Sequence, residues 1–204
     1  DCDTLPFGDW CPFPRDVALA GAALLVLSSG DRDRTCIAVL SADTGEFRYS
    51  FGSFGSSEPH QRRGATSLTV HDSLVYVADS CNHRVQVYQL ADGRHVRTIG
   101  RTGQAPTWDE DDDQWDSFDE DERIGSAPGE FHEPVGVAVG HGRLYVSEEK
   151  GRRVQVLTLE GEPLHAIASP DGRPLGGLCV DDDRIWVTGP QAARSHVHML
   201  ELAD

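Results

Sequence analysis

The sequence predicts an all-β chain that folds as a β-propeller of about four four-stranded blades, and two observations lead to that fold. The first is a repeat. Residues 68–94 and residues 129–163 both contain a strand, a short polar turn, the strand VYVAD or LYVSE, a loop and the strand RVQV. The second is the strand-like alternation of apolar residues, with glycine-bearing turns and no sustained helical period. One blade cannot cover its own apolar faces, so the repeats are expected to pack in series.

Four blades follow in order along the chain when the same frame is moved to two weaker copies. Val26 stands where Val77 and Val146 stand in the strong copies, and Trp186 stands at the position of Tyr76. Residues 1–204 are therefore expected to form one domain, with blades at residues 8–51, 60–100, 129–168 and 170–204. The interval between the second and third blades is longer than a blade requires, which assigns residues 101–128 to an inserted loop.

The two ends of the chain are expected to meet. The fourth blade has no outer strand of its own, and residues 1–7 have the length of one strand. We expect this N-terminal segment to pair beside Val197–Leu202, which closes the ring and removes exposed sheet edges. The alternative is an arc that belongs to a longer propeller. Both arrangements use the same four blades.

Charge is concentrated in the inserted loop. The chain has a net charge of −16, and residues 109–122 hold ten acidic side chains and no basic one. The blades themselves are only mildly acidic, and phosphate recognition needs a cationic face, so direct binding to nucleic acid is disfavoured. The longest apolar stretch, Val17 to Leu27, is too short to span a bilayer. No membrane span is expected, and the compartment is left unassigned.

The two strong copies also share a sequence motif. They contain G-x-F-x-x-P-x-G-V-A-V over Gly129–Val139 and Y-V-A-D-x-x-N-H-R-V-Q-V over Tyr76–Val87. This pattern resembles the NHL-repeat family of β-propellers. The resemblance implies NHL-type blades and is most specific over the second and third blades. Propellers of that family usually carry more than four blades, so the blade number here departs from the family pattern.

Two polar pairs recur in equivalent places. Asp79 with Arg84, and Glu148 with Arg153, each join the end of one strand to the start of the next. Such a pair can clamp the loop between the strands. Because it occurs in two blades, we interpret it as structural, since catalytic residues break repeat symmetry.

One face of the propeller is the predicted binding site. The long junctions, residues 52–64 and 101–128, leave the blades on the same side, and insertions in repeat proteins collect on a binding face. No nucleophile elbow, phosphate-binding glycine loop or zinc-protease helix is present in the sequence. The expected function is a non-catalytic protein–protein interaction or scaffold module that binds other protein subunits in a larger assembly and uses no cofactor. Partner-binding candidates are the arginines and aromatics of the junctions, Arg62, Arg63, Arg101, Trp108, Trp115 and Phe118.

Two alternatives stay open. A branch of the NHL family, the peptidyl-amidoglycolate lyases, carries out zinc chemistry on such a face, and YVADSCNHR resembles its blades. His60, His83 and His132 are the histidines expected to reach that face together, but three matched ligands with a tyrosine and an arginine in the expected blades are not present in the sequence. A calcium-dependent binding module is the other alternative. The inserted loop repeats the ligand spacing of an EF-hand at Asp109, Asp111, Asp113, Ser117 and Glu120, although Gln114 stands where that loop needs glycine.

Overall fold

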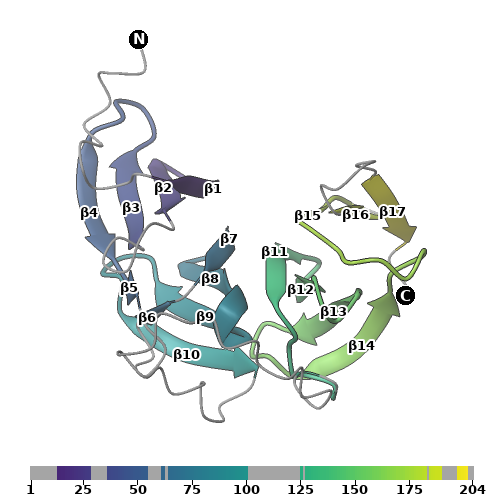
Figure 1. The fold of residues 1–204 in the computed structure, drawn as a ribbon. Helices are drawn as coiled ribbons and strands as arrows, with labels where there is room; N and C mark the ends of the chain where they lie inside the picture. The colour runs from purple at the N-terminus through teal and green to yellow at the C-terminus, as the bar shows by residue number, and fades with distance from the viewer. Residues whose placement is uncertain are drawn as a thin grey trace.

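The computed structural model describes residues 13–28, 36–54, 61–62, 64–100, 125, 127–182, 184–189 and 197–201. Over these residues the chain is all-β, and the one helical element is a short 3-10 turn, η3 (Ser80–Asn82). Apart from one short parallel pair, consecutive strands pair antiparallel into separate sheets that follow one another along the chain. The predicted propeller of four blades is confirmed (Figure 1).

Each blade runs from an inner strand outward in sequence order. Blade 1 consists of β1 (Pro14–Ala20), β2 (Ala23–Ser28), β3 (Cys36–Ser41) and β4 (Phe47–Phe51). Blade 2 consists of β7 (Ala65–His71), β8 (Leu74–Asp79), β9 (Arg84–Gln89) and β10 (His95–Gly100). Blade 3 consists of β11 (Pro134–Gly140), β12 (Arg143–Glu148), β13 (Arg153–Thr158) and β14 (Pro163–Ala168). The described part of blade 4 consists of β15 (Leu178–Val180), β16 (Arg184–Thr188) and β17 (Val197–Glu201).

Turn chemistry sets the register of the inner hairpins. The first turn residue has a positive φ in all three of the first blades: 58° at Gly21, 52° at Asp72 and 51° at His141. Two-residue turns with positive φ match the right-handed twist of paired strands, so each turn fixes which residues face each other. The registers of the blades can therefore be compared position by position.

The hydrophobic core lies between neighbouring blades. Three clusters of buried residues fill the contacts of blades 1 and 2, 2 and 3, and 3 and 4. Each cluster combines one face of a blade with the opposite face of the next. Tyr76 of blade 2 packs with Val146 of blade 3, and Tyr145 of blade 3 packs with Val187 of blade 4. Each inner blade is thus apolar on both faces, as the propeller architecture requires.

The blades form an open arc. The inner strands contact one another in chain order, β1 with β7, β7 with β11, and β11 with β15. Figure 1 shows an opening between the β1 end and the β15–β17 end of the arc. The described strands by themselves therefore do not close into a ring. The proposed closing strand at residues 1–7 lies outside the described residues, as does the outer-strand position of blade 4 after residue 201.

A short parallel pair links the first two blades. β5 (Ser53–Phe54) pairs with β6 (Gln61–Arg62) between β4 and β7. This pair lies in the first of the two long junctions that were predicted to form the loop face.

Candidate functional site

Two buried ion pairs hold the loops of the candidate face. Arg84 Nε lies 2.8 Å from Asp79 Oδ2, and Arg153 Nε lies 2.9 Å from Glu148 Oε1. Both carboxylates are completely buried. In blade 2 the side-chain amide of Asn82 also donates to Asp79. Each pair closes the loop between the second and third strands of its blade, so this edge of the sheet is rigid on both blades.

The blade 3 pair belongs to a larger network. Gln155 Nε2 donates to Glu148 Oε1 at 2.7 Å, and the backbone N–H of His132 donates to Glu148 Oε2 at 2.9 Å. Arg153 Nη2 and Gln155 Nε2 both donate to the carbonyl oxygen of Glu130. Burial raises the pKa of the Glu148 carboxyl, against the lowering effect of the hydrogen bonds from Arg153 and His132. The network fixes the segment that enters blade 3 to the loop edge of that blade.

The two loops have the same backbone shape. His83 in blade 2 and Arg152 in blade 3 both immediately precede the arginine of the ion pair, and their φ angles are 54° and 50°. A left-handed conformation is uncommon for residues other than glycine. Because it recurs at equivalent positions, it is part of the blade design.

Glu133 breaks the repeat. In the register of the inner hairpins, Gly64 and Glu133 each immediately precede the first paired residue of the inner strand. Both adopt a positive φ, 67° at Gly64 and 54° at Glu133. Blade 3 therefore places a charged side chain in a backbone conformation for which blade 2 uses glycine. The sequence analysis did not single out Glu133, although aligning the two blades shows that it replaces Gly64.

Four residues are linked by contacts where blades 2 and 3 join, and we call them the blade 2/3 cluster: His83, His132, Glu133 and Lys150. The rings of His83 and His132 meet edge to face with centroids 5.7 Å apart. His83 Nδ1 accepts the backbone N–H of Glu133 at 3.1 Å, which leaves Nε2 as the proton-bearing nitrogen of a neutral ring. Lys150 Nζ lies 3.1 Å from Glu133 Oε1, and both side chains are partly exposed. The cluster thus presents charged groups of both signs on a rigid base.

Most residues predicted to bind a partner cannot be placed. Arg62 lies in β6, and its side chain is not described; the other candidates, Arg63, Arg101, Trp108, Trp115 and Phe118, lie outside the described residues. The possible calcium ligands Asp109, Asp111, Asp113, Ser117 and Glu120 lie outside them too. Of the three histidines considered for zinc, the structure brings His83 and His132 together, and His60 is not described. The described part of the chain contains no group of three or more potential metal ligands.

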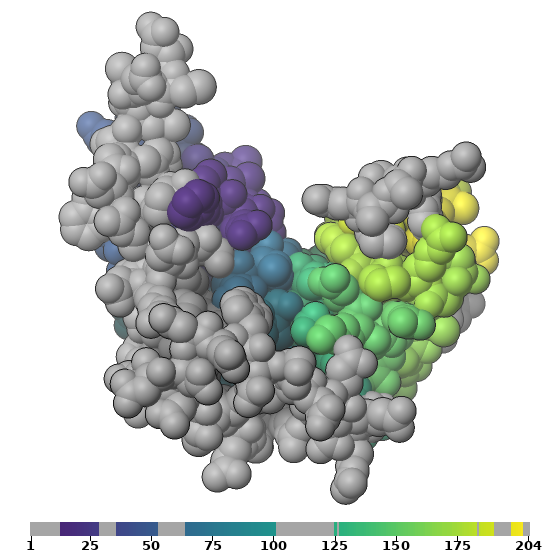
Figure 2. Space-filling model, in the orientation of Figure 1, coloured from purple at the N-terminus to yellow at the C-terminus, as the bar shows by residue number. Residues whose placement is uncertain are grey.

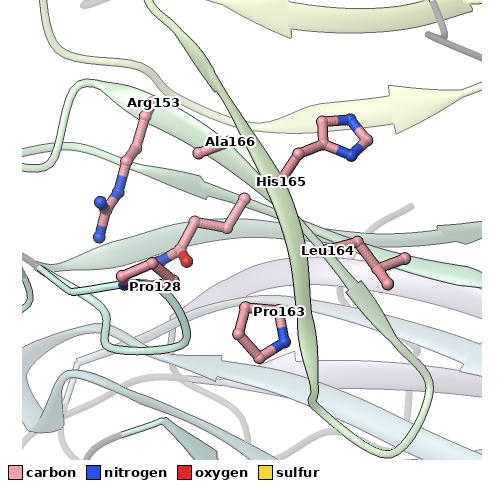
Figure 3. Close-up of a pocket in the computed structure, with 7 residues that line it drawn as sticks. Pro128, Arg153, Pro163, Leu164, His165 and Ala166 are labelled. Carbon is pink, nitrogen blue, oxygen red and sulfur yellow. The ribbon is translucent and has the colours of Figure 1, made fainter.

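A small pocket lies on the outer side of blade 3. It has a volume of about 110 Å³, below the 300–1,000 Å³ typical of ligand sites. Figure 3 shows its lining, which comes mainly from β13 and β14, with Pro128 beside them. It shares Arg153 and Gln155 with the ion-pair network. These two side chains already form hydrogen bonds in that network, so we interpret the pocket as part of the structural network and not as a ligand site.

The comparisons agree with this architecture. Residues 63–88, which include β7 and β8, match the family model of the NHL repeat. No curated protein matches the chain. The chain is similar to the solved structure of hydrazine synthase of Kuenenia stuttgartiensis, at 11% identity and a TM-score of 0.64, and the match covers 94% of this chain and 46% of that one. It is similar to the WD40 repeats of RRP9, at 11% identity and a TM-score of 0.62, over 93% of this chain and 51% of that one. It is also similar to the computationally designed Ika4 protein, at 13% identity and a TM-score of 0.56, over 92% of this chain and 91% of that one. The chain spans about half the length of the first two.

The fold and these likenesses define the class, a β-propeller. Within it, residues 63–88 are an NHL repeat, and the resemblance read from the motif is confirmed. Across the described residues, no helix is long and apolar enough to cross a membrane.

Proposed function

We propose that this propeller is a non-catalytic protein–protein interaction module, and that it presents the blade 2/3 cluster to a partner protein in a larger assembly. The observation that carries the proposal is Glu133. A residue other than glycine held in the left-handed region costs about 1–3 kcal/mol, and such strain persists where the surroundings enforce it, often at binding sites. The side chain that incurs this cost is charged, partly exposed and paired with Lys150.

The chemistry of the cluster supports binding in preference to catalysis. Its charged groups form an ion pair of opposite signs at the rim, and its histidine rings contact each other. The buried carboxylates beneath are each paired with an arginine in the same way in two blades. Groups arranged in this way can form polar contacts with the rim of a protein interface. The matching partner surface carries both a basic and an acidic side chain.

The proposal also includes a contact between the inserted loop and the same partner. Its C-terminal end leads directly into the segment that the Arg153 network fixes beside the cluster. We propose that Trp108, Trp115 and Phe118 dock on a basic surface of the same partner, and that Arg62, Arg63 and Arg101 contact its carboxylates or phosphates. Aromatic and arginine side chains supply most of the binding energy at typical interfaces.

The sequence contains a single lysine, Lys150, which allows a direct test of the face. An amine-reactive crosslinker, applied to the protein in its native cell, should join a partner protein to Lys150. Glu133→Gly should reduce the yield of that product about tenfold or more, because the charged group is lost. The same variant should unfold at an unchanged or slightly higher temperature, because glycine relieves the backbone strain.

The matched control is Glu46→Gln, at an exposed glutamate in blade 1. This variant should form the crosslinked product as the unaltered protein does. Equal yields from Glu133→Gly and the unaltered chain would contradict the assignment of the face, as would the absence of any partner joined through Lys150.

The acidic insertion is tested separately. Deletion of residues 107–124 should abolish partner binding and leave the melting temperature unchanged. Intact binding after the deletion would rule out the docking of the aromatics. A saturable change of tryptophan fluorescence at micromolar calcium, lost in Glu120→Gln, would instead favour the calcium-dependent module. Stoichiometric zinc in the purified protein would favour the lyase alternative.

A further inference from the structure

Blade 4 exposes a face that each of the first three blades buries. Val197 is 61% exposed, and the strand registers place it at the position of Ile37, Val85 and Val154, where exposure is 0%. In the first three blades this position packs against the next blade. Figures 1 and 2 show blade 4 at one end of the arc, across an opening from blade 1. In the described arc this face of blade 4 therefore has no neighbouring blade.

Met199 gives the same result two residues further along β17. It is 48% exposed, whereas Val39, Val87 and Val156 at the equivalent position are at most 1% exposed. Leu200, on the opposite side of β17, packs against blade 3 and is 8% exposed. We call the exposed side the open face of blade 4. Its side chains on β16 and β17 are Arg184, Trp186, Thr188, Val197, Met199 and Glu201.

The open face consists of three rows, because β16 and β17 pair residue by residue. Each row pairs one residue of β16 with one residue of β17: Arg184 with Glu201, Trp186 with Met199, and Thr188 with Val197. The guanidinium carbon of Arg184 also lies 6.0 Å from the centroid of the Trp186 ring. The ion pairs found among the described residues include neither Arg184 nor Glu201. Both charges are therefore available to a neighbouring molecule.

A two-fold axis between two copies matches each row with itself. An axis that is parallel to the strands and midway between β16 and β17 places β16 of each copy over β17 of the other. Arg184 of one copy then faces Glu201 of the second copy, which is a pair of opposite charges. In the next row the Trp186 ring faces the methionine sulfur of the second copy, a contact that is favourable for aromatic rings. Two sheets packed in this way keep their strands aligned at a separation of about 10 Å.

We propose that a second copy of this chain covers the open face, and that the two open faces pack on each other about this axis. An isologous contact of this kind uses one self-complementary patch on both copies. Two copies of a chain with a net charge of −16 repel each other. The open face carries one basic and one acidic side chain and is otherwise uncharged, so the copies can approach there. This inference does not depend on the blade 2/3 cluster.

The mass of the full chain in solution tests the proposal. Sedimentation equilibrium should give twice the chain mass of 22.3 kDa. Met199→Asp should raise the dimer dissociation constant about 100-fold or more, since it places a charge in an apolar contact. Leu164→Asp is the matched control, because Leu164 is equally exposed, at 49%, but lies on the outer strand β14 of blade 3. It should leave the dimer unchanged.

Exchange of the two charges tests the two-fold arrangement. Arg184→Glu places two carboxylates opposite each other in both copies, so it should raise the dissociation constant about tenfold or more. Arg184→Glu combined with Glu201→Arg restores opposite charges across the contact and should restore the dimer. An equimolar mixture of the two single variants should form a mixed dimer that is tighter than the dimer of either variant alone. All these side chains are exposed in the single copy, so each variant should keep the circular dichroism spectrum of the unaltered chain.

Three results would overturn the proposal. An unaltered chain that is monomeric at all concentrations would assign the open face to another occupant. A dimer that dissociates equally with Leu164→Asp would place the contact elsewhere. A monomeric double variant with exchanged charges would rule out the pairing of Arg184 with Glu201 and, with it, the two-fold axis between β16 and β17.

Discussion

At the scale of single residues, Arg153 connects several parts of the molecule around the loop face. It pairs with the buried carboxylate of Glu148 and donates to the carbonyl oxygens of Gly125 and Glu130. Arg153→Met should lower the free energy of unfolding at neutral pH by about 3 kcal/mol, because it leaves a buried charge without its partner. Chemical denaturation measures this. Arg152→Met, at the exposed neighbouring arginine, should have no measurable effect.

The same variant should depend on pH in a defined direction. Burial raises the native pKa of Glu148 above its ordinary value of 4.5, and loss of Arg153 raises it further. A carboxyl with a raised native pKa contributes stability that is present below the ordinary value and is lost as the pH rises through the native value. The destabilisation by Arg153→Met should therefore be small near pH 4 and larger at pH 7. Denaturation curves at both values test the sign, and an equal loss at both pH values would show that Glu148 does not carry the effect.

Among single residues, the repeated polar pairs could be predicted from the sequence, whereas Glu133, which replaces the glycine of the other blade, was not singled out. The pairs Asp79–Arg84 and Glu148–Arg153 were visible because both partners recur at one spacing. Glu133 was not singled out, since its meaning depends on a backbone φ that only the comparison with Gly64 discloses. The partner-binding candidates of the insertion remain predictions.

At the scale of elements, the close approach of β11 to blade 4 limits side-chain size. A Cβ atom at Gly136 would lie 2.6 Å from Ser147 Oγ and 2.9 Å from the backbone nitrogen of Leu178. Gly136→Ala should therefore lower stability by about 1–3 kcal/mol through overpacking. At Gly177 an added Cβ would meet only Thr188 Oγ1, at 3.9 Å, so Gly177→Ala should be nearly neutral. Thermal melting of the two variants makes the comparison, and equal melting temperatures would contradict tight packing of blades 3 and 4.

Strand positions were the most predictable part of the fold. Alternation of apolar residues and the turn signals fix them locally, and the register then follows from the two-residue turns. The short parallel pair of β5 and β6 was not predicted, because two-residue strands leave no periodic signal. The sequence left two arrangements open, a closed ring and an arc. The apolar faces of a blade indicate that other blades pack against it, but they do not fix how many blades there are.

At the scale of the whole molecule, stability should vary along the arc. Blades 2 and 3 each pack against two neighbours, whereas blades 1 and 4 pack against one in the described arc. In repeat architectures stability is close to a sum of blade and contact energies, so the end blades should open first. Hydrogen exchange of the full chain should protect amides of β8 and β12 longer than those of β2 and β16. Uniform protection across all four blades would show that the arc unfolds as a single unit.

The segment between Gly100 and Gly125 begins and ends at the two repeated ion pairs. Gly100, the last residue of β10, pairs with Arg84, and the carbonyl oxygen of Gly125 accepts a hydrogen bond from Arg153. Chain ends held in this way tolerate large changes in the length between them, because the entropy of loop closure grows slowly with length. Residues 101–124 are therefore a natural grafting position. A foreign peptide of unrelated sequence, placed between these two anchors, would be displayed on the propeller rim while the blades keep their registers.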